Sequence, residues 1–120
     1  MSIKLPVTHL ETPTTVAAWA NATFGESTLV RTVERARKEF DELEEAFCRN
    51  YTERELALEA ADVCIVLYRL IGELYPEAID AKMAINRHRI WKLDGTGCAQ
   101  HVEEEGTVDP STNPTDVVQL

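Results

Sequence analysis

The sequence EFDELEEAFCRNYTERELALEAAD, residues 39–62, contains two pairs of carboxylates at helical spacing. Glu39 and Glu42 form the first pair, and Glu59 and Asp62 form the second. Residues three apart lie on one face of a helix, so each pair is predicted to project from a single face. The sixteen residues between the pairs leave room to finish one helix, turn, and start a second helix antiparallel to it. We therefore expect the two pairs to face each other across a helix–helix seam.

Four carboxylates on one seam repel one another unless a cation lies between them. Oxygen-only ligands of this kind suit Mg²⁺ or Mn²⁺. The alternative is that each pair is a solvated acidic helix face. That alternative is weaker for Glu59 and Asp62, because their surroundings are apolar and an unpaired carboxylate is costly there.

The apolar pattern predicts a long helix on each side of the turn. The first runs from about residue 29 to 49, with a heptad-like stripe at steps of four and three: Leu29, Val33, Ala36, Phe40, Leu43 and Phe47. Glu39 and Glu42 lie along one edge of this stripe and are predicted to reach a partner helix. Asp41 and Glu45 point away from it.

The second long helix is predicted over residues 53–74. Thr52 followed by Glu55 resembles a capping box at its start, and Gly72 with Pro76 marks its end. Glu59 falls inside the apolar stripe of this helix, and Asp62 lies on the flank. Because the helix is apolar on most sides, we expect it to be central in the bundle.

A short helix is predicted from Pro13 to about Phe24, and no strand is predicted. A third long helix is predicted from about residue 77 to 93. On this third helix, spacing of i, i+4, i+7 brings three polar residues onto one face: Lys82, Asn86 and Arg89. This face is either the solvated side of the helix or, beside a metal–carboxylate cluster, a grip for phosphate. The following Gly95, Thr96 and Gly97 are weak evidence alone, and Gly95 suits the residue after a helix end.

Composition limits the class of partner. The chain has 120 residues and a formal net charge of −9, which disfavours a nucleic-acid polymer or an anionic membrane surface. Residues 1–102 are expected to form one helical domain, and residues 103–120, which contain five acids and no Lys or Arg, an acidic flexible tail. The three cysteines lack metal or disulfide spacing, and no long apolar run occurs. These features predict a cytoplasmic protein.

Several motifs of the sequence resemble those of a known family. The E-x-x-E and E-x-x-D motifs, separated by sixteen residues, are similar to those of the MazG-like all-α nucleoside triphosphate pyrophosphatases. The segment from Lys82 to Trp91 and the turn from Asp94 to Gly97, followed by His101, resemble the dATP/dGTP pyrophosphohydrolase branch, near the MazZ-like phage enzymes. The resemblance covers roughly residues 13–102.

The resemblance implies a helical bundle completed by oligomerisation, as a dimer or tetramer. It implies that Glu39, Glu42, Glu59 and Asp62 hold Mg²⁺ or Mn²⁺, with two or more ions, and that a metal-activated water attacks a purine deoxynucleoside triphosphate. The products would be the monophosphate and pyrophosphate, in the host cytoplasm if a phage encodes the protein. Substrate phosphates would be bound by a second group: Lys82, Asn86, Arg89, Gly95, Thr96 and Gly97.

Several alternatives remain open from the sequence. Either Glu42 or Glu59 would take the proton of the water, and the role of His101 is unassigned. The same reaction on dUTP or dCTP fits the acidic motif equally well. A different class of function, a non-catalytic helical module that binds a protein partner, is also compatible with the acidic face, but it gives no reason for Glu59 to lie in an apolar stripe.

Overall fold

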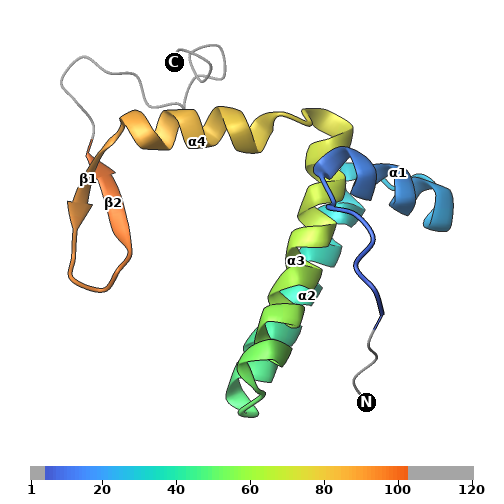
Figure 1. The fold of residues 1–120 in the computed structure, drawn as a ribbon, viewed down its shortest axis with the longest axis horizontal. Helices are drawn as coiled ribbons and strands as arrows, with labels where there is room; N and C mark the ends of the chain where they lie inside the picture. The colour runs from blue at the N-terminus through green and yellow to red at the C-terminus, as the bar shows by residue number, and fades with distance from the viewer. Residues whose placement is uncertain (1–4, 103–120) are drawn as a thin grey trace. The chain divides into compact units, whose positions relative to one another are not determined.

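The computed structural model describes residues 5–102, in which four helices precede a two-stranded hairpin (Figure 1). The elements are α1 (Pro13–Phe24), α2 (Leu29–Cys48), α3 (Glu53–Leu74), α4 (Ala78–His88), β1 (Ile90–Leu93) and β2 (Ala99–Val102). The predicted all-α class is confirmed. The predicted acidic tail, 103–120, lies outside the described residues. The chain divides into two compact units after Pro76, and each is described by itself.

The starts of α1 and α3 follow from local side-chain chemistry. The Thr12 hydroxyl accepts a hydrogen bond from the Thr15 N–H at 3.2 Å, and the Thr15 hydroxyl accepts one from the Thr12 N–H at 2.8 Å. Thr52 and Glu55 make the same reciprocal pair at 3.1 and 3.0 Å. Each pair satisfies two N–H groups that have no partner inside the helix. The capping box predicted at Thr52 is therefore confirmed.

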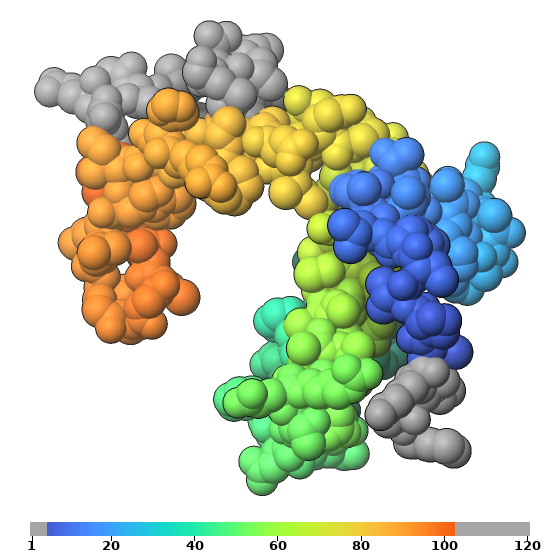
Figure 2. Space-filling model, in the orientation of Figure 1, coloured from blue at the N-terminus to red at the C-terminus, as the bar shows by residue number. Residues whose placement is uncertain are grey.

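Helices α2 and α3 form an antiparallel hairpin, as predicted. The connecting turn contains Asn50 in the left-handed region, with φ of 56°, a conformation that asparagine adopts more readily than most residues. Helix α3 contacts both α1 and α2, so its predicted central position holds within this unit. Figure 2 shows that α1 packs near one end of the hairpin and that the end nearest the α2–α3 turn stays uncovered by α1. No residue of α3 is fully buried in the single chain.

The predicted stripe on α2 is correct at Ala36 and Leu43, which are half-buried, and wrong at its other four positions, which are exposed. The buried residues of α2 are Thr32, Glu39 and Ala46, seven apart, whereas Phe40 and Phe47 are 51% and 72% exposed. Both rows have the same period, so periodicity could not decide which of them meets α3. The buried row carries the small side chains of Thr32 and Ala46, and the bulky aromatic row lies beside it. Glu39 therefore lies inside the helix–helix contact rather than at its edge.

Gly72 lies inside α3 and does not end it. A Cβ atom at this position would lie 2.2 Å from the Pro13 carbonyl oxygen and 2.7 Å from the Ala17 Cβ. Glycine is thus required by the close crossing of α1 and α3. Val16, Ala17 and Ala20 of α1 are buried.

We expect Gly72→Ala to destabilise the protein, although alanine in an open helix stabilises by about 0.5–1 kcal/mol relative to glycine. The added methyl group must push a backbone carbonyl away, and overpacking of this kind costs about 1–3 kcal/mol. Urea unfolding followed by circular dichroism measures the difference. A variant as stable as the wild type would contradict this account of the α1–α3 crossing.

The second unit differs from the sequence prediction. Helix α4 ends at His88, and β1 pairs antiparallel with β2, so the prediction of a helix to residue 93 and of no strand is wrong. Ile90 and Trp91 have side chains that favour strands. Gly95 and Gly97 have φ of 84° and 87° in the turn of the hairpin, so Gly95 is a turn residue and not a helix C-cap.

The turn is fixed by Asp94. Its carboxylate accepts hydrogen bonds from the Thr96 hydroxyl at 2.6 Å and the Thr96 N–H at 2.9 Å. These bonds lower the pKa of Asp94 because they stabilise the charged carboxylate. Across the strands, Trp91 pairs with His101, and their rings meet edge to face at 6.0 Å between centroids. In the part of the chain the structure describes, no helix is long and apolar enough to cross a membrane.

Candidate functional site

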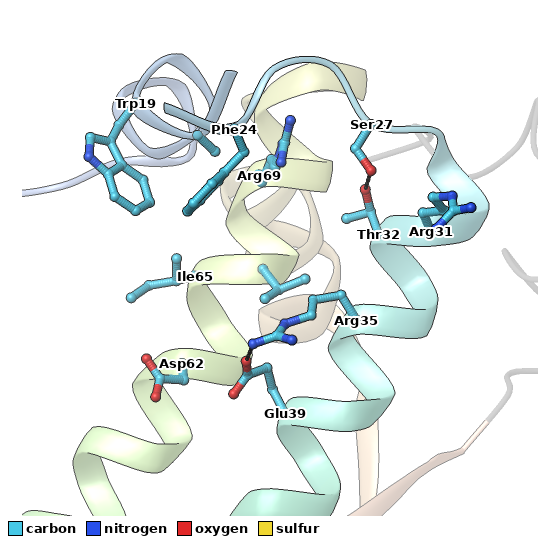
Figure 3. A pocket seen from close by; sticks show the side chains of 12 residues that line it. Trp19, Phe24, Ser27, Arg31, Thr32, Arg35, Glu39, Asp62, Ile65 and Arg69 are labelled. Carbon is cyan, nitrogen blue, oxygen red and sulfur yellow. Dashed lines mark hydrogen bonds and ion pairs between the residues drawn. The ribbon is translucent and has the colours of Figure 1, made fainter. Parts of the chain in front are cut away.

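A pocket of about 520 Å³ lies between α1, α2 and α3 (Figure 3). Carboxylates stand at one end of it, on α2 and α3, and aromatic rings at the other, near the end of α1. Charged and apolar side chains line the space between the two ends. The lining residues include Trp19, Phe24, Arg31, Arg35, Glu39, Asp62, Ile65 and Arg69.

Glu39 is the buried member of the acidic group. Only 6% of the residue is exposed, because it lies in the row through which α2 meets α3. Its carboxylate forms an ion pair with the Arg35 guanidinium, one helical turn earlier on α2 (Figure 3). The Arg35 side chain is itself 54% exposed and reaches down from the pocket to the acid. A buried carboxylate is costly without a partner, and Arg35 supplies that partner in this structure.

The four predicted acids influence one another across the seam. The pKa of Glu42 is raised, because its side chain hydrogen-bonds to Glu39 and because the charges of Glu39 and then Glu59 repel its own. Partial burial raises the pKa of Asp62, and the charge of Glu39 adds to that effect. Arg35 opposes the shift in both groups. Charge effects thus act between α2 and α3, from Glu59 on Glu42 and from Glu39 on Asp62, and the role of the four acids as one site stays a prediction.

The donor chemistry of this group fits a hard divalent cation, since every candidate ligand is a carboxylate oxygen. Within residues 5–102, however, no three Asp, Glu, His or Cys side chains are arranged to hold a metal ion. One carboxylate of the four is engaged by Arg35. The residue types of a metal site are therefore present, but within the described residues they are not grouped closely enough to hold an ion. Metal binding by these residues stays a prediction.

The opposite end of the pocket was not predicted from the sequence. Trp19 and Phe24 meet edge to face, with ring centroids 5.3 Å apart and planes at 84° (Figure 3). Both are largely exposed, at 54% and 68%. Their spacing of five residues in a short helix does not predict that they line the same pocket as Glu39 and Asp62.

Three arginines line the pocket, and they differ in what they bind. Arg69 holds the helix ends together: its guanidinium donates to the Asn21 side chain at 2.8 Å and to the Gly25 carbonyl, and it pairs with Glu73 at 3.3 Å. Arg35 pairs with Glu39. Arg31, among the described residues, makes no ion pair and is the available cation of the pocket.

The predicted phosphate-binding residues lie in the second unit. Lys82 and Asn86 are on α4, four residues apart, so they share a face as predicted. Arg89 lies just beyond the helix, in an extended conformation, and its guanidinium is 3.5 Å from the Asn86 side-chain oxygen. The predicted single helical face of three residues is therefore wrong for Arg89. Gly95, Thr96 and Gly97 form the hairpin turn. Phosphate binding by this unit is untested and stays a prediction.

Comparison with known proteins gives one informative similarity. The chain is 35% identical over 97 residues to a dATP/dGTP diphosphohydrolase of Salmonella phage PMBT28. The matched region is 78% of this chain but 31% of that protein, so the chain spans about a third of the length of its relative. No family model matches the chain, and no solved structure matches it.

We expect Asp62→Asn to leave the metal-free protein as stable as the wild type, or somewhat more stable. The substitution keeps the shape of the side chain and removes a charge that burial and Glu39 both disfavour. Melting followed by circular dichroism, with a chelator present, measures this. Asp41→Asn, on the exposed side of α2, is the matched control and should change little. A markedly lower melting temperature for Asp62→Asn alone would make Asp62 a structural residue.

Proposed function

We propose that the protein is a metal-dependent nucleoside triphosphate pyrophosphohydrolase that converts dATP or dGTP to the monophosphate and pyrophosphate. The observation that carries the proposal is the pocket of the first unit, which joins a carboxylate group to arginines and to a pair of aromatic rings. These are the three kinds of group that a nucleotide with a metal-bound triphosphate requires. The name of the phage relative supports the same class of reaction and the purine substrate.

Each end of the pocket takes a different part of the substrate in this proposal. The rings of Trp19 and Phe24 offer apolar surface against which a base can stack. Arg31 offers a guanidinium with no other ion pair among residues 5–102, which suits a phosphate oxygen. Glu39, Glu42, Glu59 and Asp62 would hold one or more Mg²⁺ or Mn²⁺ ions.

The reaction joins a water oxygen to the α-phosphorus and breaks the bond between that phosphorus and the bridging oxygen to the β-phosphate. A divalent ion, when bound, lowers the pKa of water and offsets the charge of the triphosphate. The proton of the water goes to a carboxylate, either Glu42 or Glu59. Pyrophosphate leaves with the electron pair of the broken bond.

The alternatives stay distinguishable. The same chemistry on dUTP or dCTP would use the same carboxylates and differ at the aromatic end. A non-catalytic helical module would have no use for an acid in its helix–helix contact. The burial of Glu39 between α2 and α3, beside two other carboxylates that sense its charge, favours a binding site for a cation over such a module.

A panel of all deoxy- and ribonucleoside triphosphates, with Mn²⁺ or a chelator and with product analysis, tests the proposal. We expect metal-dependent release of pyrophosphate, fastest with dATP or dGTP. Glu39→Gln should reduce the rate by about 100-fold or more, because catalytic groups lose alignment. Glu45→Gln is the control: this acid pairs with Arg49 at 2.6 Å on the exposed side of α2, so turnover should persist. Absence of pyrophosphate from every nucleotide would contradict the proposal.

We also propose that a second copy of the chain completes the bundle. The apolar row beside the α2–α3 contact, Val33, Phe40 and Phe47, is 44–72% exposed, and α3 adds Leu58 and Ile65 at 53% and 41%. Burial of such side chains stabilises association at about 25 cal/mol per Å² of apolar surface. The resemblance to dimeric and tetrameric enzymes supports the same expectation.

Light scattering should therefore give a mass of two or four chains for the wild type. Phe40→Glu places a charge in the exposed row without touching the α2–α3 contact, so it should reduce the mass to one chain while the helical circular dichroism signal persists. A wild-type protein that is monomeric and well folded at assay concentration would refute the proposed association.

A further inference from the structure

We propose that Arg35 is a displaceable counter-cation that competes with the divalent metal for Glu39. The inference rests on the proposed function, because it assigns the metal to the same acidic group. It adds a residue outside the four acids and gives it a role in deciding when that group binds metal. Arg35 lies four residues before Glu39 on α2, and both line the same pocket.

The first observation is the asymmetry of the ion pair. The Glu39 side chain is 8% exposed, whereas that of Arg35 is 54% exposed. The acid is fixed in the α2–α3 contact, and the guanidinium approaches it from the open side of the pocket, as Figure 3 shows. A long, exposed arginine side chain can leave such a contact without disturbing the helices. Glu39 cannot move in the same way.

The second observation is that, of the three arginines lining the pocket, Arg35 is the one that pairs with a carboxylate of the acidic group within residues 5–102. The remaining arginines of the pocket do not share this role, because Arg69 is held by Asn21, Gly25 and Glu73, and Arg31 has no acidic partner among the described residues.

The third observation is the incomplete convergence of the acids. No three of them are arranged to hold an ion within residues 5–102, and one carboxylate oxygen of Glu39 is bound to the guanidinium. A divalent ion needs carboxylate oxygens at about 2.0–2.6 Å, which places its charge against that of Arg35 if both share Glu39. The guanidinium therefore opposes metal binding to Glu39, and the ion binds more tightly once the guanidinium has moved away.

Two consequences follow. Free metal binds the wild-type protein more weakly than it would bind the same acids without Arg35. A triphosphate offers the released guanidinium another anion in the pocket, so the ion binds better when the nucleotide is present. By thermodynamic linkage, the Arg35–Glu39 ion pair lowers the affinity for metal by the same factor by which bound metal weakens the ion pair.

The test measures Mn²⁺ binding by calorimetry, without catalysis. Arg35→Gln should bind Mn²⁺ alone about fivefold or more tightly than the wild type, within the usual range for coupled sites. Arg31→Gln removes the same charge from the same pocket but no ion pair, so it should tighten Mn²⁺ binding clearly less. Arg35→Lys keeps the charge but not the fork of the guanidinium, and should lie between Arg35→Gln and the wild type. It also covers the case in which Arg35→Gln fails to fold.

A second arm adds a dATP analogue with a methylene group between the α- and β-phosphorus atoms. The analogue should raise Mn²⁺ affinity more in the wild type than in Arg35→Gln, because only the wild type has a guanidinium to release. Equal Mn²⁺ affinity in Arg35→Gln and Arg31→Gln would overturn the inference, even if the protein hydrolyses nucleotides. Hydrolysis that fails while Arg35→Gln still tightens Mn²⁺ binding would overturn the proposed activity alone.

Discussion

The burial of one carboxylate, Glu39, in the contact between α2 and α3 is the constraint on which the rest of the site depends. A charge at 6% exposure needs a cation, and the chain supplies one from Arg35 on the same helix. Burial, with the charge of Glu39 added, raises the pKa of Asp62 on α3, and the hydrogen bond and the charge of Glu39 raise the pKa of Glu42 on α2. In the proposed site, the same burial that makes the Glu39 charge costly would favour the binding of a divalent ion.

The fold places this acid where one pocket joins it to arginines and aromatic rings. The crossing of α1 over α3, which needs the missing side chain of Gly72, brings the end of α1 close to the hairpin. Arg69 then ties that end down through Asn21 and Gly25. As a result Trp19 and Phe24 lie beside the same pocket as Glu39 and Asp62, although the rings and the acids are 15 to 43 positions apart in the sequence.

Local chemistry made much of this predictable. The capping residue Thr52 and the apolar spacing placed α2 and α3 correctly, whereas the convergence of the four acids on one site stays a prediction. The predictions that failed depend on tertiary contacts, which local sequence patterns do not specify. Two rows of α2 share a seven-residue period, so the prediction placed Phe40 and Phe47 in the contact, where the structure buries Glu39 and Ala46. The β-hairpin after His88 was missed because Ile90 and Trp91 also continue a helical apolar pattern. The sequence shows Arg35 four residues before Glu39. The importance of this ion pair, however, follows from the burial of Glu39, which the sequence did not predict.

The proposed function depends on a divalent metal that binds between the acids of α2 and α3. Paramagnetic broadening of backbone amide NMR signals by small amounts of Mn²⁺ locates the ion directly. We expect the amides around Glu39 and Glu42 on α2, and around Glu59 and Asp62 on α3, to broaden first, and Glu39→Gln to reduce the effect at all of them. Broadening centred on the acidic residues 103–116, with the middle of α2 and α3 unaffected, would contradict the claim.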